Sequence, residues 1–226
     1  MLLGGAAMEQ LAAAHVLVCG VGGVGSFSAE SLARAGVGRI TLLDSDTVAR
    51  SNINRQLIAL ESTIGRPKVA VAAERIADIN PECRVTPLHR LLTAEEVPAL
   101  LEGGFDYVID AIDMVTPKLA LIEHCIRRGI PVISALGTGN KLDPARLQVT
   151  DISKTSVCPL ARVVRRELKN RGIAHHKVLF STEEPITPAP LCSEEGRRAI
   201  PGSTVFVPPV AGILLAREAV LEIIGR

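Results

Sequence analysis

Short apolar runs alternate along this chain with longer segments in which apolar residues recur at helical spacing. Residues 16–19 form an apolar run of strand length, and in residues 26–35 Ala29, Leu32 and Ala33 fall on one face of a helix. The alternation predicts an α/β fold, a Rossmann-like doubly wound and mostly parallel sheet with helices on both faces. The expected strands are 16–19, 40–43, 84–88, 107–111 and 131–135, and the expected helices are 1–14, 26–35, one that begins at 67, 94–101 and 117–128.

The pattern changes in the last third of the chain. We expect a strand at 147–152, a helix at 157–170, a strand at 177–180, a proline-rich loop at 185–209 and an apolar helix at 210–224. The length of 226 residues suits one large domain, and no internal repeat divides it. We therefore predict a single domain, 1–226, with a core at 15–150 and a C-terminal α/β extension at 151–226.

A glycine-rich turn joins the first strand of the core to its first helix. Residues 20–25 read GVGGVG, and Asp44 ends the next apolar run. This arrangement is typical of a dinucleotide fingerprint, in which the glycines let backbone N–H groups approach a phosphate and the acid accepts hydrogen bonds from a ribose. The alternative is a tight strand-to-helix turn without a ligand, which leaves Asp44 unexplained.

Charged residues further along the chain change this interpretation. Arg55 lies in the polar segment 45–63, and Lys68 follows it, so that two cations lie in the loops that flank the glycine turn. Two cations suit a triphosphate better than a nicotinamide, whose hydride chemistry needs a neutral, flat pocket. Asp113 ends a strand at 107–112 on the same edge of the sheet, where a carboxylate beside phosphates is a natural Mg²⁺ ligand. Taken singly, each charge is better explained as a solvated surface group; together they favour a nucleotide site.

Composition narrows the class of protein. The sequence is 47% hydrophobic and 22% charged, which favours a globular chain, and no apolar run is long enough to cross a bilayer. The first residues lack the features of a secretory signal, so we expect a cytoplasmic protein without an integral membrane segment. The five cysteines occur singly, with no C-x-x-C pair, so we expect reduced thiols and no zinc. A net charge of +1 gives no overall sign of nucleic-acid binding, and an aromatic content of 2% offers few side chains on which bases could stack. Any RNA partner must therefore be bound through a local cluster of charge.

Cysteine and histidine offer two further candidate sites. Cys158 and Cys192 could act as thiol acceptors in sulfur transfer, but a lone cysteine is more often a small buried hydrophobe, which we prefer here. His175 and His176 have no second ligand pair at metal spacing, so we expect both at the surface. Residues 137–140, which follow an expected strand, either border an acceptor pocket or form a simple turn.

Five motifs in order, GVGGVGS, LLDSDTV, SNINRQ, GRPK and VIDAID, resemble the ubiquitin-activating-like (ThiF-type) adenylyltransferases over residues 15 to about 150. The resemblance implies that the protein binds ATP and Mg²⁺ and activates a carboxylate by adenylation. It implies that Asp44 holds the ribose, that Arg55 and Lys68 hold the phosphates, and that Asp113 holds the Mg²⁺; these last three are the catalytic candidates. The ATP-binding candidates are Gly20, Gly22, Gly23, Gly25, Asp44, Asp46, Asn52, Asn54, Arg55, Gln56 and Lys68.

The second half of the chain resembles one branch of this family, the tRNA threonylcarbamoyladenosine dehydratases. The motifs that carry this resemblance are NPEC at 80–83, AID at 111–113, LQVTD at 147–151, FSTE at 180–183 and PGS at 201–203. The branch implies ATP-dependent cyclisation of the threonylcarbamoyl group on a tRNA adenosine. The threonyl carboxylate is adenylated and then attacked by an oxygen of the same modification, so no catalytic cysteine is required. The C-terminal extension would then serve acceptor binding and dimer packing.

A local cluster of positive charge supports a tRNA partner independently. Between residues 162 and 177 there are six cations and one acid, Glu167. Helical spacing places most of the cations on the face opposite Leu160, Val164 and Leu168, where they could track phosphates; a solvated helix face is the alternative. The candidate tRNA-binding residues are Arg162, Arg165, Arg166, Lys169 and Arg171.

The resemblance also bears on assembly and on rival functions. It implies a homodimer in which an N-terminal Arg reaches the ATP of the partner; the sequence starts after that segment, so either the start is truncated or the trans arginine is dispensable. It leaves open a sulfur-relay protein partner. The same fold could instead adenylate the C-terminal glycine of a ubiquitin-like sulfur carrier. An NAD-dependent oxidoreductase and a catalytically idle binding module are the alternatives from other classes.

Overall fold

A seven-stranded sheet forms the centre of the molecule in the computed structural model, which describes residues 2–187 and 202–226. The strand order is β3-β2-β1-β4-β5-β7-β6, and every neighbouring pair is parallel except β6 and β7. This confirms the predicted mostly parallel, doubly wound sheet. The strands are β1 (His15–Cys19), β2 (Arg39–Leu43), β3 (Arg84–Leu88), β4 (Tyr107–Asp110), β5 (Val132–Ala135), β6 (Leu147–Asp151) and β7 (Lys177–Ser181).

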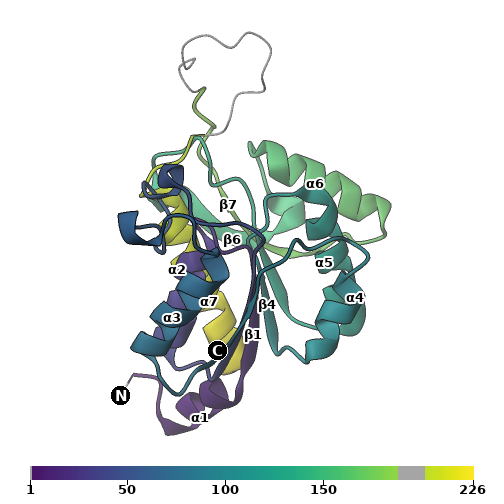
Figure 1. Cartoon of the computed structure of the whole chain (residues 1–226). Coiled ribbons are helices and arrows are strands. Elements are labelled where there is room, and N and C mark those ends of the chain that lie inside the picture. The colour runs from purple at the N-terminus through teal and green to yellow at the C-terminus, as the bar shows by residue number, and fades with distance from the viewer. Residues whose placement is uncertain (1, 188–201) are drawn as a thin grey trace.

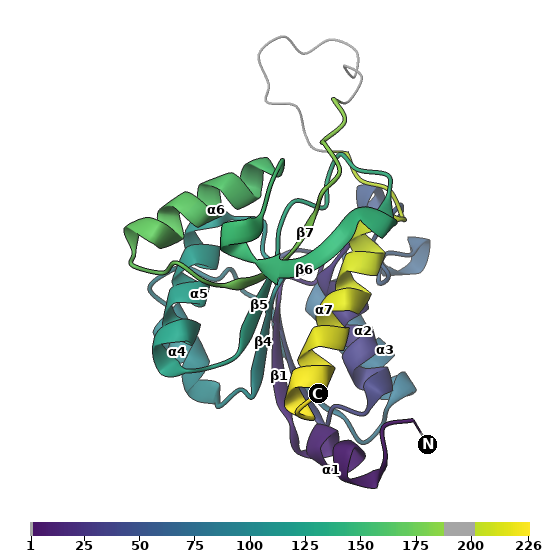
Figure 2. The ribbon, with the colours of Figure 1, turned by 180° about the vertical axis from the view of Figure 1, so that it is seen from behind.

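Helices cover both faces of the sheet, as Figures 1 and 2 show. One face carries α2, α3 and the C-terminal α7, with α1 beside the lower end of β1 in Figure 1; the other face carries α4, α5 and α6. Each face buries its own apolar clusters, because parallel strands connected by crossovers are apolar on both sides. The helices are α1 (Gly5–Ala13), α2 (Gly25–Ala35), α3 (Lys68–Ile79), α4 (Val97–Leu100), α5 (Val115–Arg128), α6 (Pro159–Asn170) and α7 (Val207–Ile223).

The first and last long helices pack closely against each other. A Cβ on Gly212 of α7 would lie 2.2 Å from the carbonyl oxygen of Val24, just before α2, so only glycine permits this approach. The Ser28 hydroxyl of α2 donates a 2.9 Å hydrogen bond to the Gly212 carbonyl oxygen. The C-terminal helix therefore supports the turn that precedes α2.

Several predicted boundaries are wrong. The loop predicted at 185–209 ends earlier, because α7 begins at Val207 and holds Pro208 and Pro209 in its first turn, where an N–H has no helical partner to lose. The strand predicted to reach residue 112 ends at Asp110, and the helix predicted at 94–101 is a short α4 followed by a 3₁₀ turn. The helix predicted from 157 begins at Pro159. Within the described residues, no helix is long and apolar enough to span a membrane.

Candidate active site

A cleft of about 510 Å³ opens at the carboxyl ends of β1, β2 and β4, the edge at which open α/β sheets bind ligands. Most of the residues predicted to bind the nucleotide line this cleft. They are Gly20, Gly22, Gly23, Asp44, Asp46, Asn52, Arg55, Gln56, Lys68 and Asp113. Two predicted residues, Gly25 and Asn54, do not line it.

The glycine turn allows close contact between β1, α2 and β4. Gly20 has φ +87°, and a Cβ there would lie 2.6 Å from the carbonyl oxygen of Ala111, which follows β4. Gly25 is buried at the start of α2, and its Cβ would lie 1.7 Å from the carbonyl oxygen of Gly20. Gly25 thus allows the turn to close rather than lining the cleft. The turn leaves the N-terminal end of α2 facing the cleft, where unpaired N–H groups favour an anion.

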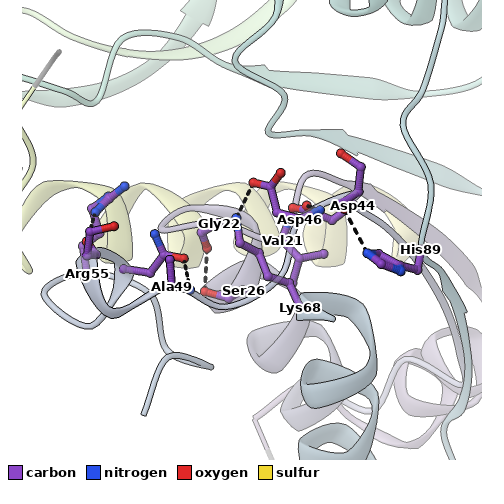
Figure 3. Close-up of polar contacts among 12 residues, drawn as sticks. Val21, Gly22, Ser26, Asp44, Asp46, Ala49, Arg55, Lys68 and His89 are labelled. Carbon is purple, nitrogen blue, oxygen red and sulfur yellow. Dashed lines mark hydrogen bonds and ion pairs between the residues drawn. The ribbon is translucent and has the colours of Figure 1, made fainter. Parts of the chain in front are cut away.

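Asp44 ties the glycine turn to the loop that follows β2. Its Oδ2 accepts a 2.7 Å hydrogen bond from the N–H of Val21, and its Oδ1 accepts one of 2.8 Å from the N–H of Asp46 (Figure 3). Asp44 therefore has a structural function that the fingerprint alone did not indicate. Each carboxylate oxygen carries a second lone pair, which remains available to a ribose hydroxyl.

Lys68 brings a positive charge into the cleft from the first turn of α3. Its Nζ lies 2.7 Å from Oδ2 of Asp46, and Figure 3 shows the two side chains pointing toward each other. The Lys68 side chain is 6% exposed, whereas that of Asp46 is 63% exposed. Because Asp46 is well hydrated, the pair is weak in net energy, and Lys68 can transfer to a phosphate oxygen at little cost.

Arg55 is held on the opposite side of the glycine turn. Its guanidinium donates to the Ser51 carbonyl oxygen at 3.0 Å and to Oδ1 of Asn54 at 2.9 Å. Asn54 in turn donates to the carbonyl oxygen of Ser203 at 2.8 Å. Asn54, predicted to bind the nucleotide, thus orients Arg55 and links the loop at 50–56 to the segment before α7.

Gln56 carries an unsatisfied acceptor beside the cleft. Its residue is 6% exposed, and its Oε1 is a buried side-chain oxygen without a hydrogen-bond partner in the described part of the chain. A buried polar atom without a hydrogen-bond partner costs about 1–3 kcal/mol. A hydrogen-bond donor of a ligand bound in the cleft would offset that cost.

Asp113 reaches the cleft from the loop between β4 and α5. It lies three residues beyond the end of β4, is exposed, and accepts no hydrogen bond from the residues that the structure describes. A carboxylate with free oxygens at the edge of this cleft fits Mg²⁺, which takes one or two carboxylates together with phosphate oxygens and water. The residues present therefore suit the metal that the sequence suggested.

The cleft also has walls that sequence reasoning missed. Leu91 and Met114, both about half exposed, give it apolar surface suited to a purine ring. Pro208 of α7 lies against the turn, since a Cβ on Gly23 would be 3.1 Å from its Cβ. Leu91 and Met114 could have been predicted, because they follow β3 and β4 at the edge of the sheet where ligands are expected. Nothing in the sequence near Pro208 indicates that it lies beside the cleft. Further lining residues are Val24, Leu43, Ser45, Arg90, Leu92, Ala111, Ile112, Thr138 and Ser203.

A buried polar layer lies beside the cleft, between β4, β5 and α5. Nζ of Lys118 lies 2.7 Å from Oδ2 of Asp110, and both side chains are 0% exposed. Nearby, the Ser134 hydroxyl and Nε2 of His176 are 2.8 Å apart. His176 is 5% exposed, so the prediction that it lies at the surface is wrong, while His175 is exposed as predicted. Burial, and then the charge of Lys118, lower the pKa of His176 to about 3, so its ring is neutral.

The predicted tRNA-binding residues divide into two groups. Arg162, Arg166 and Lys169 are exposed on α6, where Arg166 also pairs with its neighbour Glu167 at 2.8 Å. Arg165 instead turns inward and donates to the carbonyl oxygen of Thr155 at 2.7 Å and to its Oγ1 at 2.6 Å. Arg171 is paired with Glu123 of α5 at 2.5 Å. The exposed basic surface is therefore smaller than the sequence indicates.

Cys158 lies at the start of α6, where it is 3% exposed and its Sγ accepts a 3.4 Å hydrogen bond from the N–H of Ala161. This supports our preference for a buried residue over a thiol acceptor. Cys192 lies outside the described residues. Within them, no group of three or more His, Cys, Asp and Glu side chains could hold a metal.

Comparisons with known proteins agree with this geometry. A profile of the ThiF family matches residues 1–226. The chain is 44% identical to the tRNA threonylcarbamoyladenosine dehydratase of Bacillus subtilis over 99% of this chain and 92% of that protein. It is 46% identical to the enzyme of the same name from Escherichia coli over 83% of this chain and 73% of that protein. A crystal structure of the Escherichia coli enzyme with ATP superposes with a TM-score of 0.91 at 40% identity and covers 99% of this chain and 91% of that one.

Proposed function

The chain belongs to the ThiF family, and from that premise we propose that it is an ATP-dependent enzyme that cyclises threonylcarbamoyladenosine in tRNA, with loss of water. The observation that carries the proposal is the cleft, where Arg55, Lys68 and Asp113 lie around the glycine turn. The fold around this cleft is similar to that of a dehydratase crystallised with ATP. A nicotinamide oxidoreductase does not need this set of charges around its reactive ring.

The reaction divides into activation and ring closure. An oxygen of the threonyl carboxylate attacks the α-phosphorus of ATP, the bond to the β-phosphate breaks, and pyrophosphate leaves. An oxygen of the same threonylcarbamoyl group then attacks the activated carbonyl carbon, a proton is lost to solvent, and AMP leaves. The ATP is consumed, and the modified base loses the elements of water. In such chemistry the protein contributes mainly positioning and charge, so no protein base is needed.

The cleft residues divide these tasks between them in our proposal. The glycine turn and the N-terminal end of α2 hold phosphate oxygens through backbone N–H groups. Lys68 leaves Asp46 to contact the triphosphate, and Arg55, oriented by Asn54, neutralises charge that develops on the leaving pyrophosphate. Asp44 accepts a ribose hydroxyl with its remaining lone pairs.

Asp113 would hold Mg²⁺ in the proposed site. When bound beside the phosphates, Mg²⁺ supplies positive charge that favours departure of pyrophosphate. The support for this assignment is the free carboxylate of Asp113 at the edge of the cleft. We retain the prediction that no zinc is required.

Mass spectrometry of tRNA nucleosides tests the function directly. Incubation of threonylcarbamoyladenosine-containing tRNA with the protein, Mg²⁺ and ATP should give a nucleoside lighter by one water, together with AMP and pyrophosphate. A mass that stays unchanged with ATP would contradict the proposal. Pyrophosphate exchange that responds to a ubiquitin-like sulfur carrier but not to tRNA would support the rival activity instead.

We propose that tRNA contacts α6 through Arg162, Arg166 and Lys169, because these cations are exposed and lie on one helix face. Replacement of each by Gln should weaken tRNA binding and reduce the slope of log affinity against log salt by about 1 per residue. Arg165→Gln is the matched control: it lies on the same helix but bonds Thr155, so it should affect stability rather than the salt slope. Equal salt slopes in all four variants would exclude this surface.

We also propose a homodimer. Phe206, which immediately precedes α7, and Ile213, in the second turn of α7, are 55% and 49% exposed and leave apolar surface for a second copy to cover. Light scattering coupled to gel filtration measures the mass, and a monomer at micromolar concentration would contradict the proposal. A sulfur-relay partner and a cytoplasmic location remain predictions from the sequence.

A further inference from the structure

The loop that carries Asp113 is short and has no regular structure of its own. β4 ends at Asp110 and α5 begins at Val115, so residues 111–114 alone connect the strand to the helix. Each residue of such a loop costs about 1–2 kcal/mol of backbone entropy to order. The Asp113 carboxylate lies at the exposed edge of this loop. It can keep one orientation toward bound phosphates only if contacts from other residues hold the loop in place.

Asp110 provides two of those contacts. Its Oδ2 accepts the 2.7 Å hydrogen bond from Nζ of Lys118, in the first turns of α5. Its Oδ1 accepts a 3.1 Å hydrogen bond from the N–H of Ile112, inside the loop. One buried carboxylate therefore joins the end of β4, the middle of the loop and the beginning of α5.

Lys118 extends the network to a second loop. Its Nζ also donates to the carbonyl oxygen of Ala135 at 3.2 Å, at the end of β5. Thr138, which lines the cleft, follows three residues later. On the other side, the carbonyl of Ala111 packs against Gly20 of the glycine turn. Asp110 and Lys118 thus lie where the loops after β1, β4 and β5 meet.

Burial of this pair is not explained by stability. Removal of two charges from water costs several kcal/mol per ion, and an apolar pair of similar size often packs as well or better. The hydrogen bonds of an ion pair are directional, whereas apolar contacts are not. Directional contacts can fix the orientation of a nearby side chain, here the carboxylate of Asp113.

We propose that Asp110 and Lys118 are positioning residues: together they hold residues 111–114 so that the Asp113 carboxylate faces the metal and phosphates. The inference rests on the proposed function, because it takes Asp113 as a metal ligand. Neither residue touches substrate; both act through the loop.

The test uses the full-length protein with Asp110→Leu and Lys118→Met combined, which removes both charges and leaves no buried ion unpaired. The first measurement is the affinity for Mn²⁺ in the presence of a non-hydrolysable ATP analogue, read from the electron paramagnetic resonance of free Mn²⁺. The second is hydrogen exchange at the backbone amides of residues 111–114. We expect the Mn²⁺ affinity to fall about tenfold and exchange at these amides to rise by at least as much, while binding of the analogue without metal stays within about twofold.

Ser134→Ala is the matched control. It removes the hydroxyl that bonds His176 in the same buried layer but no contact to the loop. It should lower thermal stability and leave both Mn²⁺ affinity and loop exchange unchanged. A general loss of packing would instead change these quantities in both variants.

Wild-type Mn²⁺ affinity and wild-type loop exchange in the folded double variant would overturn the inference. If that variant does not fold, the same readouts on Asp110→Asn decide, because its amide keeps the size of the carboxyl but offers one acceptor where the loop and Lys118 need two. Asp113→Asn separates the two proposals. If it leaves Mn²⁺ affinity unchanged, the metal assignment fails, whereas exchange at residues 111–114 still reports whether Asp110 and Lys118 hold the loop.

Discussion

Two lysine–aspartate pairs in this molecule have the same chemistry and the same length and a buried lysine each, but their aspartates differ in exposure. Nζ of Lys68 lies 2.7 Å from Oδ2 of Asp46 in the cleft, and Nζ of Lys118 lies 2.7 Å from Oδ2 of Asp110 in the buried layer beside it. The Asp46 side chain is 63% exposed, whereas neither member of the second pair is exposed at all. Exposure, rather than geometry, separates a pair that can exchange partners from one that cannot.

The reason is the cost of separating the charges. Water screens Asp46, so Lys68 can leave it for a phosphate and the carboxylate stays solvated. The Asp110 side chain is fully buried, so loss of its cation leaves an unpaired charge in the interior. The cleft pair therefore suits ligand exchange, and the buried pair suits a fixed scaffold.

The largest expected effect comes from breaking the buried pair on one side. Lys118→Met should lower the free energy of unfolding by about 3–5 kcal/mol, because Asp110 is left charged and buried. Chemical denaturation at neutral pH measures this. A loss below about 1 kcal/mol would show that Asp110 takes up a proton or water at little cost, and the contrast between the two pairs would fail.

Breaking the cleft pair should affect activity rather than stability. Lys68→Met should reduce the rate of tRNA-dependent ATP cleavage by about 10²–10³, as loss of a preorganised electrostatic group does. The free energy of unfolding should change by no more than about 1 kcal/mol, since Asp46 is already hydrated. A variant that unfolds as readily as Lys118→Met would contradict this separation.

These contrasts also show what the sequence could and could not predict. The sequence predicts Arg55, Lys68 and Asp113 together, because Arg55 and Lys68 lie in the loops that flank the glycine turn and Asp113 follows a strand whose carboxyl end lies at the same edge of the sheet. Lys118 looks like an ordinary surface lysine in the sequence, because its burial depends on how α5 docks over β4. The function of Asp44 in holding Val21 is likewise a property of the folded turn, not of the fingerprint spacing.

The burial of His176 is a second property that the sequence could not predict. His175 and His176 are adjacent and identical in type, and the chain enters β7 directly after them. Side chains alternate in direction as a strand begins, so one ring points to solvent and the other to the buried layer. Which of the two is buried depends on strand register, and that register appears only with the neighbouring β5 and β6 in place.

The buried layer should also respond to pH, through His176. The pKa of His176 is about 3 in the folded protein, below its ordinary value of 6.5, so the unfolded chain binds this proton first as pH falls. Stability should therefore decrease by up to about 1.4 kcal/mol per pH unit from about pH 6 to pH 4. His176→Gln should flatten this dependence, and His175→Gln, the exposed neighbour, should retain it. Parallel pH profiles for wild type and His176→Gln would contradict the assignment.

The smallest effect should come from the exposed member of the cleft pair. Asp46→Asn should change the free energy of unfolding by less than about 1 kcal/mol, because Asp46 is hydrated and the amide oxygen of Asn can still accept the hydrogen bond of the buried Lys68. Thermal denaturation in parallel with Lys118→Met gives the comparison. A loss above 2 kcal/mol would mean that the two pairs are energetically alike.

The contact between α2 and α7 has a consequence for biosynthesis. Ser28 and Gly212, which bond to each other, are 184 residues apart in the chain, and Pro208 lies against Gly23 in the same region. At 5–20 residues per second, a ribosome makes the second partner roughly ten to forty seconds after the first. The nascent chain therefore exposes an unsupported glycine turn throughout that interval. A ribosome-bound fragment that lacks α7 therefore cannot form the contact between the glycine turn and α7, which is completed only when nearly the whole chain has been made.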